Sequence, residues 1–357
     1  IKAAPFSKIF REENEEILVH TGQHYDANMS DIFFEELDIP RPDYNLDVGS
    51  GKHGMQTGRM LERIEELLLY VKPDGVLVYG DTNSTLAGAL AASKLHIPVF
   101  HVEAGLRCYN KLMPEEQNRI LTDHISDLLL CPTQTAVNNL AKEGITSGVI
   151  NTGDIMYDAV LNNINISIQR FAGRTMLNEL KDEKGKIFDF KEKEYYLATI
   201  HRAENTDDLG KLCDIFTAFE NMDKPVLMPL HPRTRKQING LGLKFNNLTV
   251  IDPVGYLLML YLTTNAYMVI TDSGGLQKEA YFLKTPCTTL RDQTEWVETL
   301  ENGWNVLCPI NVDRIIETAS RELKCIQDPQ PQLFGDGHAA ERIYEAIKNG
   351  GKNYEQH

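Results

Sequence analysis

The chain has 357 residues, of which 42% are hydrophobic and 24% charged, and its formal net charge is −15. This composition predicts a folded protein of two domains and excludes a disordered or fibrous chain. The negative charge argues against nucleic-acid partners, and no apolar run is long enough for membrane insertion. The six cysteines are scattered without a spacing typical of zinc or a redox pair, so we expect reduced cysteines and a cytoplasmic location.

The first half alternates short apolar runs with longer helical patterns. The chain opens inside an expected helix, Lys2–Glu13, and because α/β domains usually begin with a strand, we expect one upstream of it. Expected strands are Ile17–His20, Val76–Tyr79, Val99–Val102, Leu128–Cys131 and Gly148–Thr152. Expected helices are Met55–Lys72, Ser84–Leu95, Glu116–Ser126 and Thr135–Glu143. Such alternation predicts a parallel sheet covered by helices.

The same pattern restarts in the second half. Expected strands are Tyr195–Ile200, Val226–Leu230, Thr249–Ile251, Met268–Thr271 and Thr288–Leu290. Expected helices are Leu209–Asn221, Tyr256–Thr264 and Leu276–Leu283. We therefore predict an α/β fold of two Rossmann-like, doubly wound domains, residues 1–154 and 155–337. The pattern alone allows a last helix, His338–Lys348, to pack on either domain.

A glycine-rich turn follows one strand of the second domain. Ser273, Gly274 and Gly275 lie between a strand and a helix, where free backbone N–H groups and the positive helix end attract anions. Without a Cβ, the glycines let the oxygens of a diphosphate approach the backbone. The alternative is a strand-to-helix turn in which Ser273 caps the helix. The sequence leaves both interpretations open.

Other polar residues near strand ends allow the same two interpretations. Glu279, on the next helical turn, is placed to accept hydrogen bonds from ribose hydroxyls, or it is an exposed helix carboxylate. His231 and Arg233 are placed to neutralise a pyrophosphate, or they belong to a solvated helix start. His201 and Arg202 have the same ambiguity.

A set of acids follows strands of the first domain. Asp81 and Glu103 come after neighbouring strands, so both are expected at the same sheet edge, where ligands of doubly wound sheets bind. Glu115 and Glu116 open a helix, where acids are favoured by the helix dipole, and for Glu116 we favour that structural role. Converging carboxylates raise one another's pKa, so such a cluster is costly unless it performs acid/base work.

Seven short motifs occur in a defined order. They are Thr21-Gly22-Gln23-His24-Tyr25, Gly80-Asp81-Thr82, His101-Val102-Glu103-Ala104-Gly105-Leu106-Arg107, Pro114-Glu115-Glu116 with Asn118-Arg119, His201-Arg202-Ala203-Glu204-Asn205, Leu230-His231-Pro232, and Asp272-Ser273-Gly274-Gly275 through Glu279. Each motif alone is weak, but the ordered set is specific. Together they resemble the non-hydrolysing UDP-N-acetylglucosamine 2-epimerases.

The resemblance implies a glycosyltransferase-B type fold, usually a homodimer, with the C-terminal helix 338–350 joined to the first domain. It implies a UDP-linked N-acetylhexosamine substrate, and elimination of UDP to a 2-acetamidoglycal followed by re-addition, without a metal or nicotinamide. The acid/base set carried over by position is Asp81, Glu103 and Glu115, with His201 binding or protonating the phosphates. The residues carried over for substrate and UDP binding are Lys2, Arg119, His231, Arg233, Asp272, Ser273, Gly274, Gly275, Glu279 and Arg291.

Two segments depart from the family pattern. Thr294-Glu295 is followed by Trp296-Val297-Glu298, where many relatives have Arg-Pro, and residues 50–54 lack the Gln-rich pattern of bacterial relatives. Both features resemble relatives acting on UDP-2,3-diacetamido-2,3-dideoxyglucuronic acid, for which Lys52, Arg107 and Lys111 are candidate cations near the sugar carboxylate. A sugar-transferring enzyme of the same fold and a non-catalytic UDP-sugar-binding protein are the remaining alternatives.

Overall fold

The computed structural model describes residues 1–22, 36–37, 39–173, 180–182, 185, 187–230, 245–321, 323 and 330–354. The chain divides into two compact units, which we call the front unit (Ile1–Leu161 with Gln332–His357) and the rear unit (Asn162–Pro331). The division falls inside helix α7 (Ile155–Phe171), whereas the predicted domain boundary falls at its start. The limits of the independently folding domains stay a prediction.

The front unit is built around a parallel sheet of four strands in the order β3-β4-β5-β6. A separate parallel pair joins β1 to β2. The elements of the unit are α1 (Ala3–Phe10), β1 (Val19–His20), β2 (Tyr44–Asn45), α3 (His53–Val71), β3 (Val76–Tyr79), α4 (Asn83–Lys94), β4 (Val99–Val102), α5 (Pro114–Ile125), β5 (Leu128–Cys131), α6 (Gln134–Lys142), β6 (Val149–Asn151) and α14 (Ala339–Tyr354).

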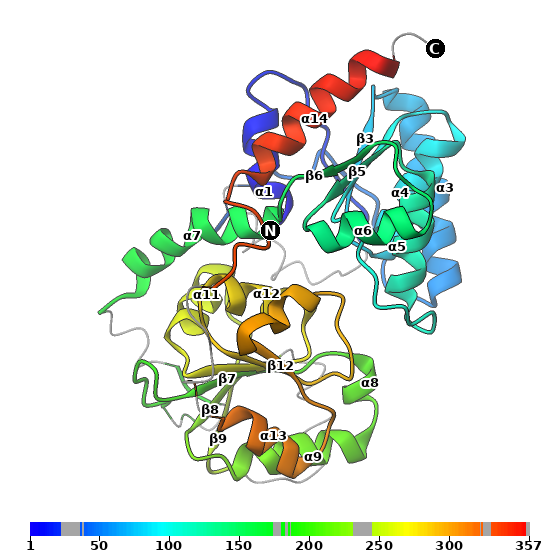
Figure 1. The fold of residues 1–357 in the computed structure, drawn as a ribbon. Helices are drawn as coiled ribbons and strands as arrows, with labels where there is room; N and C mark the ends of the chain where they lie inside the picture. The colour runs from blue at the N-terminus through cyan, green and yellow to red at the C-terminus, as the bar shows by residue number, and fades with distance from the viewer. Residues whose placement is uncertain are drawn as a thin grey trace. The chain divides into compact units, whose positions relative to one another are not determined.

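Side chains of β3 alternate between two apolar layers, as the period of a strand requires. Val76 and Val78 face a layer formed with α3 and α4. Leu77 and Tyr79 face the layer that contains α1 and α14, and Figure 1 shows α14 lying along α1. Covering both faces of the sheet with helices leaves the strand ends as the place where polar side chains gather.

The rear unit contains a parallel sheet of six strands in the order β12-β11-β10-β7-β8-β9. The strand order reverses between β7 and β10, which makes this pair the topological switch point where ligands of such sheets bind. The elements are β7 (Tyr196–Thr199), α8 (Ala203–Thr206), α9 (Leu209–Glu220), β8 (Val226–Pro229), β9 (Leu248–Ile251), α11 (Tyr256–Asn265), β10 (Met268–Thr271), α12 (Gly274–Phe282), β11 (Cys287–Thr289), the 3-10 helix η2 (Val297–Gly303), β12 (Asn305–Leu307) and α13 (Val312–Ala319).

The predicted strands are confirmed, several with the expected bounds, but helix α7 was missed. Its sequence is rich in Asn and Ile, which have modest helix propensity, so local preference does not reveal the helix. In the rear unit its last part is held by tertiary contacts, since Ser167 Oγ donates to the Leu257 carbonyl at 2.6 Å and Phe171 packs on Tyr261. Within the described part of the chain, every helix is too short or too polar to cross a membrane.

Candidate active site

Glu103 lies beside Gly80 at the edge of the front sheet. The ends of β3 and β4 are in register, since Tyr79 pairs with Val102, so the residues that follow them are neighbours. The Glu103 carboxylate accepts a hydrogen bond from Lys2 Nζ. A Cβ placed on Gly80 would lie 3.1 Å from Lys2 Nζ and 3.3 Å from Glu103 Oε2, so the ion pair occupies the space over this glycine.

The backbone at Glu103 has an uncommon conformation for a residue with a side chain. Its φ is +70°, in the left-handed region that costs free energy for residues other than glycine. Only 4% of Glu103 is exposed. Strain of this kind persists where the surroundings fix a side chain in a functional orientation.

Asp81 is held from helix α5. Arg119 donates to Asp81 Oδ2 from Nε at 3.0 Å, and its Nη2 lies 2.8 Å from the same oxygen. Asn118 Nδ2 donates to the Asp81 carbonyl at 2.9 Å. The Asp81 side chain keeps 31% of its surface exposed, so it remains within reach of a ligand while Arg119 balances its charge.

The two acids that open α5 have different surroundings. Glu116 is fully buried and accepts hydrogen bonds from the backbone N–H groups of Cys108 and Tyr109 and from Arg119 Nη1 at 2.5 Å. It therefore holds the preceding loop, which is the structural role we favoured. Glu115 is half-buried, which leaves it accessible for chemistry.

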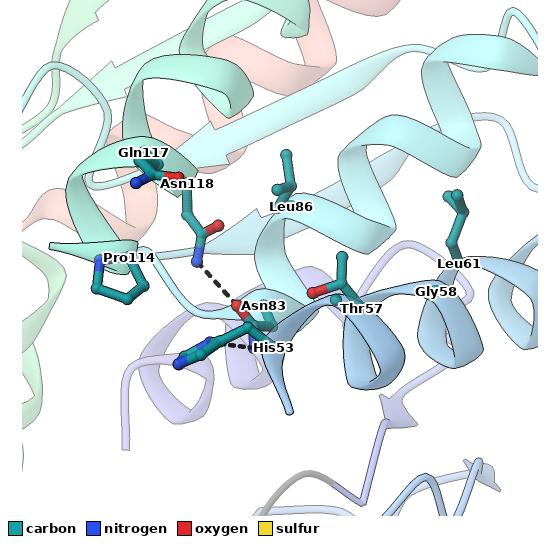
Figure 2. A pocket seen from close by; sticks show the side chains of 10 residues that line it. His53, Thr57, Gly58, Leu61, Asn83, Leu86, Pro114, Gln117 and Asn118 are labelled. Carbon is teal, nitrogen blue, oxygen red and sulfur yellow. Dashed lines mark hydrogen bonds between the residues drawn. The ribbon is translucent and has the colours of Figure 1, made fainter. Parts of the chain in front are cut away.

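A pocket of about 340 Å³ opens next to this cluster, where α3, α4 and α5 begin. Figure 2 shows His53, Asn83 and Asn118 along one side of it. Asn83 Nδ2 lies 3.2 Å from His53 Nδ1, and Asn118 Nδ2 lies 3.3 Å from Asn83 Oδ1. Sequence reasoning missed the part played by Asn83, although its place directly after Asp81-Thr82 in the same turn was the available signal.

In the rear unit, the loops after β7 and β10 meet at the switch point. The Asp272 carboxylate is fully buried and accepts from the backbone N–H groups of His201 and Arg202 at 3.1 Å and from Asn205 Nδ2 at 3.0 Å. These contacts show that Asp272 holds the His201 turn, and its part in substrate binding stays a prediction. The His201 ring is 55% exposed, with Nδ1 3.3 Å from Asp272 Oδ1.

The Ser273 turn has the cap that its sequence predicts, since Ser273 Oγ accepts from the Leu276 N–H at 3.3 Å at the start of α12. A Cβ on Gly274 would lie 2.8 Å from Glu295 Oε1 and 3.6 Å from Trp296 Nε1, so this glycine admits the Glu295 carboxylate beside the helix start. Arg291, predicted to line the cleft, is 5% exposed, and its Nη2 lies 2.9 Å from Glu295 Oε2. Its visible partner is thus Glu295.

Glu279 is 6% exposed, so the alternative of an exposed helix carboxylate is wrong. Burial raises the pKa of its carboxyl group to about 7. A carboxyl group with this pKa exists in both protonation states near neutrality and can accept or donate a hydrogen bond. The predicted residues His231 and Arg233 lie outside the described residues.

The structure also shows the surroundings of two further residues that the sequence singled out. Arg107, a candidate cation for a sugar carboxylate, is 3% exposed and paired with Asp123 and Glu143, so it is not available to a ligand. Trp296, which departs from the family pattern, lies under Lys278, whose Nζ is 3.5 Å from the ring centroid. Among the described residues, no three His, Cys, Asp or Glu side chains are grouped to hold a metal ion.

Comparison with known proteins identifies the family. The family model described as UDP-N-acetylglucosamine 2-epimerase matches residues 8–348. The chain is 53% identical to the UDP-2,3-diacetamido-2,3-dideoxy-D-glucuronate 2-epimerase of Pseudomonas aeruginosa, covering 97% of this chain and 96% of the relative. It is 47% identical to the UDP-N-acetylglucosamine 2-epimerase of Methanococcus maripaludis, covering 92% and 90%.

A solved structure gives the same result. The UDP-GlcNAc 2-epimerase of Methanocaldococcus jannaschii, in complex with UDP-GlcNAc and UDP, superposes with a TM-score of 0.87 at 43% identity, covering 98% of this chain and 96% of that one. The likeness confirms the predicted α/β fold of two Rossmann-like domains of the glycosyltransferase-B type. The chain therefore belongs to the UDP-N-acetylglucosamine 2-epimerase family.

Proposed function

We propose that this chain is an isomerase that interconverts UDP-N-acetylglucosamine and UDP-N-acetylmannosamine. The observation that carries the proposal is the pair of acids at adjacent strand ends, Asp81 with Arg119 and Glu103 with Lys2. A protein that only binds UDP-sugars has no use for two acids each matched to a cation. Family membership supplies the nucleotide-sugar chemistry for which such acids are suited.

The reaction needs a base and an acid because the hydrogen on sugar C2 is not next to a carbonyl. A base removes the C2 proton as the anomeric C–O bond breaks, and the electron pair of that bond leaves with UDP. The product is a 2-acetamidoglycal with a double bond between C1 and C2. An acid then returns a proton to the opposite face of C2 while a phosphate oxygen of UDP bonds to C1, which gives the epimer.

Asp81, Glu103 and Glu115 are the proposed acid/base set. Lys2 and Arg119 hold two of these carboxylates in place and balance their negative charge. In the rear unit, the start of α12 at Ser273 and Gly274 is suited to the diphosphate of UDP. Glu279 is proposed for the ribose hydroxyls, and His201, with His231, Arg233 and Gly275, for the phosphates.

The diacetamido-glucuronate substrate is the second candidate. Two observations favour it: the 53% identity to the Pseudomonas aeruginosa enzyme, and Trp296 in place of the Arg of many relatives. Arg107 is buried and paired with Asp123 in the front unit. The remaining candidate cations for the uronate are therefore Lys52 and Lys111, both exposed.

Incubation in heavy water separates these functions. The proposal predicts that UDP-N-acetylglucosamine gains one deuterium at C2 and that UDP-N-acetylmannosamine forms, both followed by NMR. Exchange only with the diacetamido-glucuronate nucleotide would establish the second candidate. Release of free UDP and N-acetylmannosamine would indicate a hydrolysing enzyme, and no C2 exchange with either sugar would leave a sugar-transferring or sugar-binding protein.

The homodimer and the cytoplasmic location stay predictions. Sedimentation equilibrium of the purified chain tests the first, with a mass of about twice that of one chain expected. Fractionation of the source cells tests the second.

A further inference from the structure

A polar network buried in the front unit lies behind the proposed acid/base set. His101, on β4, and Asp123, on α5, are at most 1% exposed. His101 Nδ1 lies 2.7 Å from Asp123 Oδ1, and His101 Nε2 lies 2.8 Å from the Gly80 carbonyl oxygen. Neither residue has a part in the reaction steps above.

Both ring nitrogens of His101 face hydrogen-bond acceptors. The Gly80 carbonyl can only accept, so Nε2 carries a hydrogen. Burial raises the pKa of Asp123, but the hydrogen bond from His101 and the charges of His101 and Arg107 outweigh it, so the net pKa is lowered. His101 Nδ1 and Asp123 Oδ1 share the second hydrogen bond of the ring. The ring thus joins β3 to α5 through two directed bonds.

The second oxygen of Asp123 holds the loop after β4. Asp123 Oδ2 accepts from the Gly105 N–H at 3.1 Å and from Arg107 Nη1 at 2.6 Å. Gly105 has a φ of +80°, and a Cβ there would lie 2.4 Å from the Ala136 carbonyl oxygen, so the loop is pressed against α6. Glu103 lies between the two residues, His101 and Gly105, that Asp123 holds.

The same pair controls the surroundings of all three acids. Gly80, whose carbonyl His101 binds, directly precedes Asp81. The strained backbone of Glu103 is fixed on both sides, at residues 101 and 105. Asp123 itself belongs to α5, the helix whose first turn carries Glu115. A strained backbone conformation such as that of Glu103 persists only if the surrounding contacts fix it. The hydrogen bonds at His101 and Gly105 supply such contacts.

We propose that His101 and Asp123 are positioning residues that set the distances among Asp81, Glu103 and Glu115. The inference rests on the proposed function, because it assigns the acids a reaction. A purely structural role is the alternative, since a buried, fully bonded polar network also contributes stability. The two roles differ in whether losing the network slows the chemistry of molecules that remain folded.

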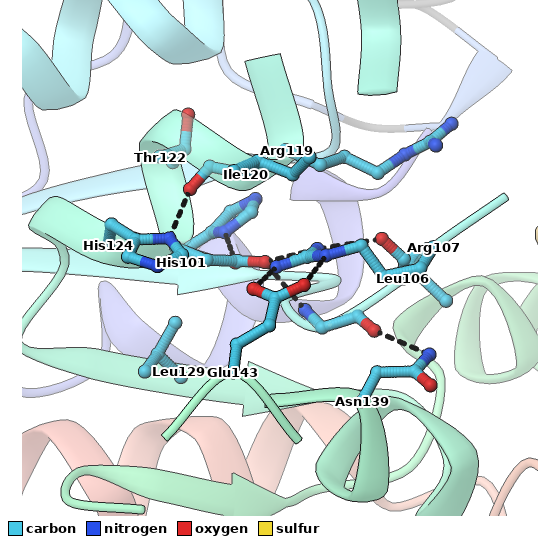
Figure 3. A network of polar contacts seen from close by, with 12 residues as sticks. His101, Leu106, Arg107, Arg119, Ile120, Thr122, His124, Leu129, Asn139 and Glu143 are labelled. Carbon is cyan, nitrogen blue, oxygen red and sulfur yellow. Dashed lines mark hydrogen bonds and ion pairs between the residues drawn. The ribbon is translucent and has the colours of Figure 1, made fainter. Parts of the chain in front are cut away.

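The outer part of the network offers a matched control. Glu143 accepts from Arg107 Nε at 2.7 Å and from Nη2 at 2.8 Å, on the side of the guanidinium away from Asp123, and Figure 3 shows Glu143 facing Arg107. Asp123→Asn and Glu143→Gln each replace one carboxylate partner of Arg107 by an isosteric amide. Only Asp123→Asn disturbs the bonds to His101 and Gly105.

The test compares kcat, KM and the UDP dissociation constant of these two variants with those of the wild type, per folded molecule. Asp123→Asn is expected to lower kcat about 100-fold, the cost of a misplacement of about 1 Å, and to change KM and UDP affinity less than about threefold. Glu143→Gln is expected to lower the melting temperature while kcat stays within about twofold. Equal losses of kcat in both variants, or an unchanged kcat in Asp123→Asn, would overturn the proposal.

Two measurements keep the test decisive. If Asp123→Asn does not fold, His101→Gln replaces it, with the same kcat loss expected and an unchanged kcat overturning the proposal. If the wild type exchanges C2 of neither UDP-sugar, the proposed function has failed. Crystal structures of wild type and Asp123→Asn then decide the positioning role, because the proposal predicts a displaced Glu103 carboxylate and an undisturbed one contradicts it.

Discussion

The front and rear units place their candidate functional groups at equivalent points, just after the ends of parallel strands, but the acids at these points have different partners. In the front unit, the carboxylates of Asp81 and Glu103 face the cationic side chains of Arg119 and Lys2. In the rear unit, the Asp272 carboxylate accepts from backbone N–H groups of the neighbouring loop.

The difference indicates two tasks. A fully buried carboxylate like Asp272, which accepts from two backbone N–H groups and from the Asn205 side chain, fixes a turn. The Asp81 carboxylate, held by a side-chain cation, remains 31% exposed and is accessible to take or return a proton. The proposed function accordingly assigns proton transfer to the front unit and UDP binding to the rear unit.

The largest effect is expected from replacing an acid of the front unit by its neutral amide, which tests the division of tasks between the units. We expect Asp81→Asn and Glu103→Gln each to lower the rate of C2 exchange by about 10²- to 10⁴-fold, the range of general acid–base catalysis, because an amide cannot transfer the proton. UDP affinity, measured by titration calorimetry, is expected within about tenfold of the wild type. A parallel loss of UDP affinity would show that the two tasks are not divided between the units.

The pH dependence of stability tests the burial of Glu279 in the rear unit. Because its folded pKa is about 7, against 4.5 in a model compound, the folded state binds this proton more tightly. The resulting stability is complete below the unfolded pKa and is lost as pH rises toward 7. Glu279→Gln, which stays neutral, is expected to gain up to about 3 kcal/mol in unfolding free energy relative to the wild type between pH 4.5 and 7. Urea denaturation at several pH values measures this, and parallel pH curves would contradict it.

A substitution at Gly80 tests how closely Lys2 and Glu103 pack at the front site. Gly80→Ala places a methyl group against Lys2 and Glu103 at a φ of +67°, so we expect kcat to fall about 100-fold through misplacement of the acid. Gly144→Ala is the control, since Gly144 has a φ of +82° with no atom within 4 Å of the added Cβ. Both variants are expected to lose about 1–2 kcal/mol of stability. Equal kcat values for the two variants would mean that only backbone strain matters.

Ser273 gives the smallest expected effect. Ser273→Ala removes the cap of α12 and one hydroxyl from the proposed anion site, so we expect about 1 kcal/mol less stability and about tenfold weaker UDP binding. Asn311→Ala removes the cap of α13, where Asn311 Oδ1 accepts from the Arg314 N–H, and serves as the control. It is expected to lose similar stability and to bind UDP normally by calorimetry.

Much of the fold follows from local pattern. Strands such as Val76–Tyr79 and Met268–Thr271 are short apolar runs, so their bounds could be predicted from the sequence. The neighbouring positions of Asp81 and Glu103 followed from strand order alone. Helix α7 could not be predicted, because tertiary contacts stabilise a segment of low helix propensity.

The partners of individual site residues depend on which strands, distant in the sequence, lie side by side in the sheet. Asp272 meets the 201–205 turn only because β10 lies beside β7, 72 residues away at Thr199 and Thr271. Arg107 was a candidate cation for the sugar and one interpretation of Glu279 was an exposed helix carboxylate, yet both are buried, because helix packing around the sheet and not their own polarity sets their exposure.

The most direct test of the division of tasks is one reaction in heavy water, run side by side with the wild type and Glu103→Gln at equal occupancy by UDP-N-acetylglucosamine. We predict that the wild type forms both epimers with deuterium at C2, while the variant returns unlabelled substrate. Deuterium at C2 in the variant at the wild-type rate, or an epimer that retains protium at C2 in the wild type, would contradict proton transfer by the front acids.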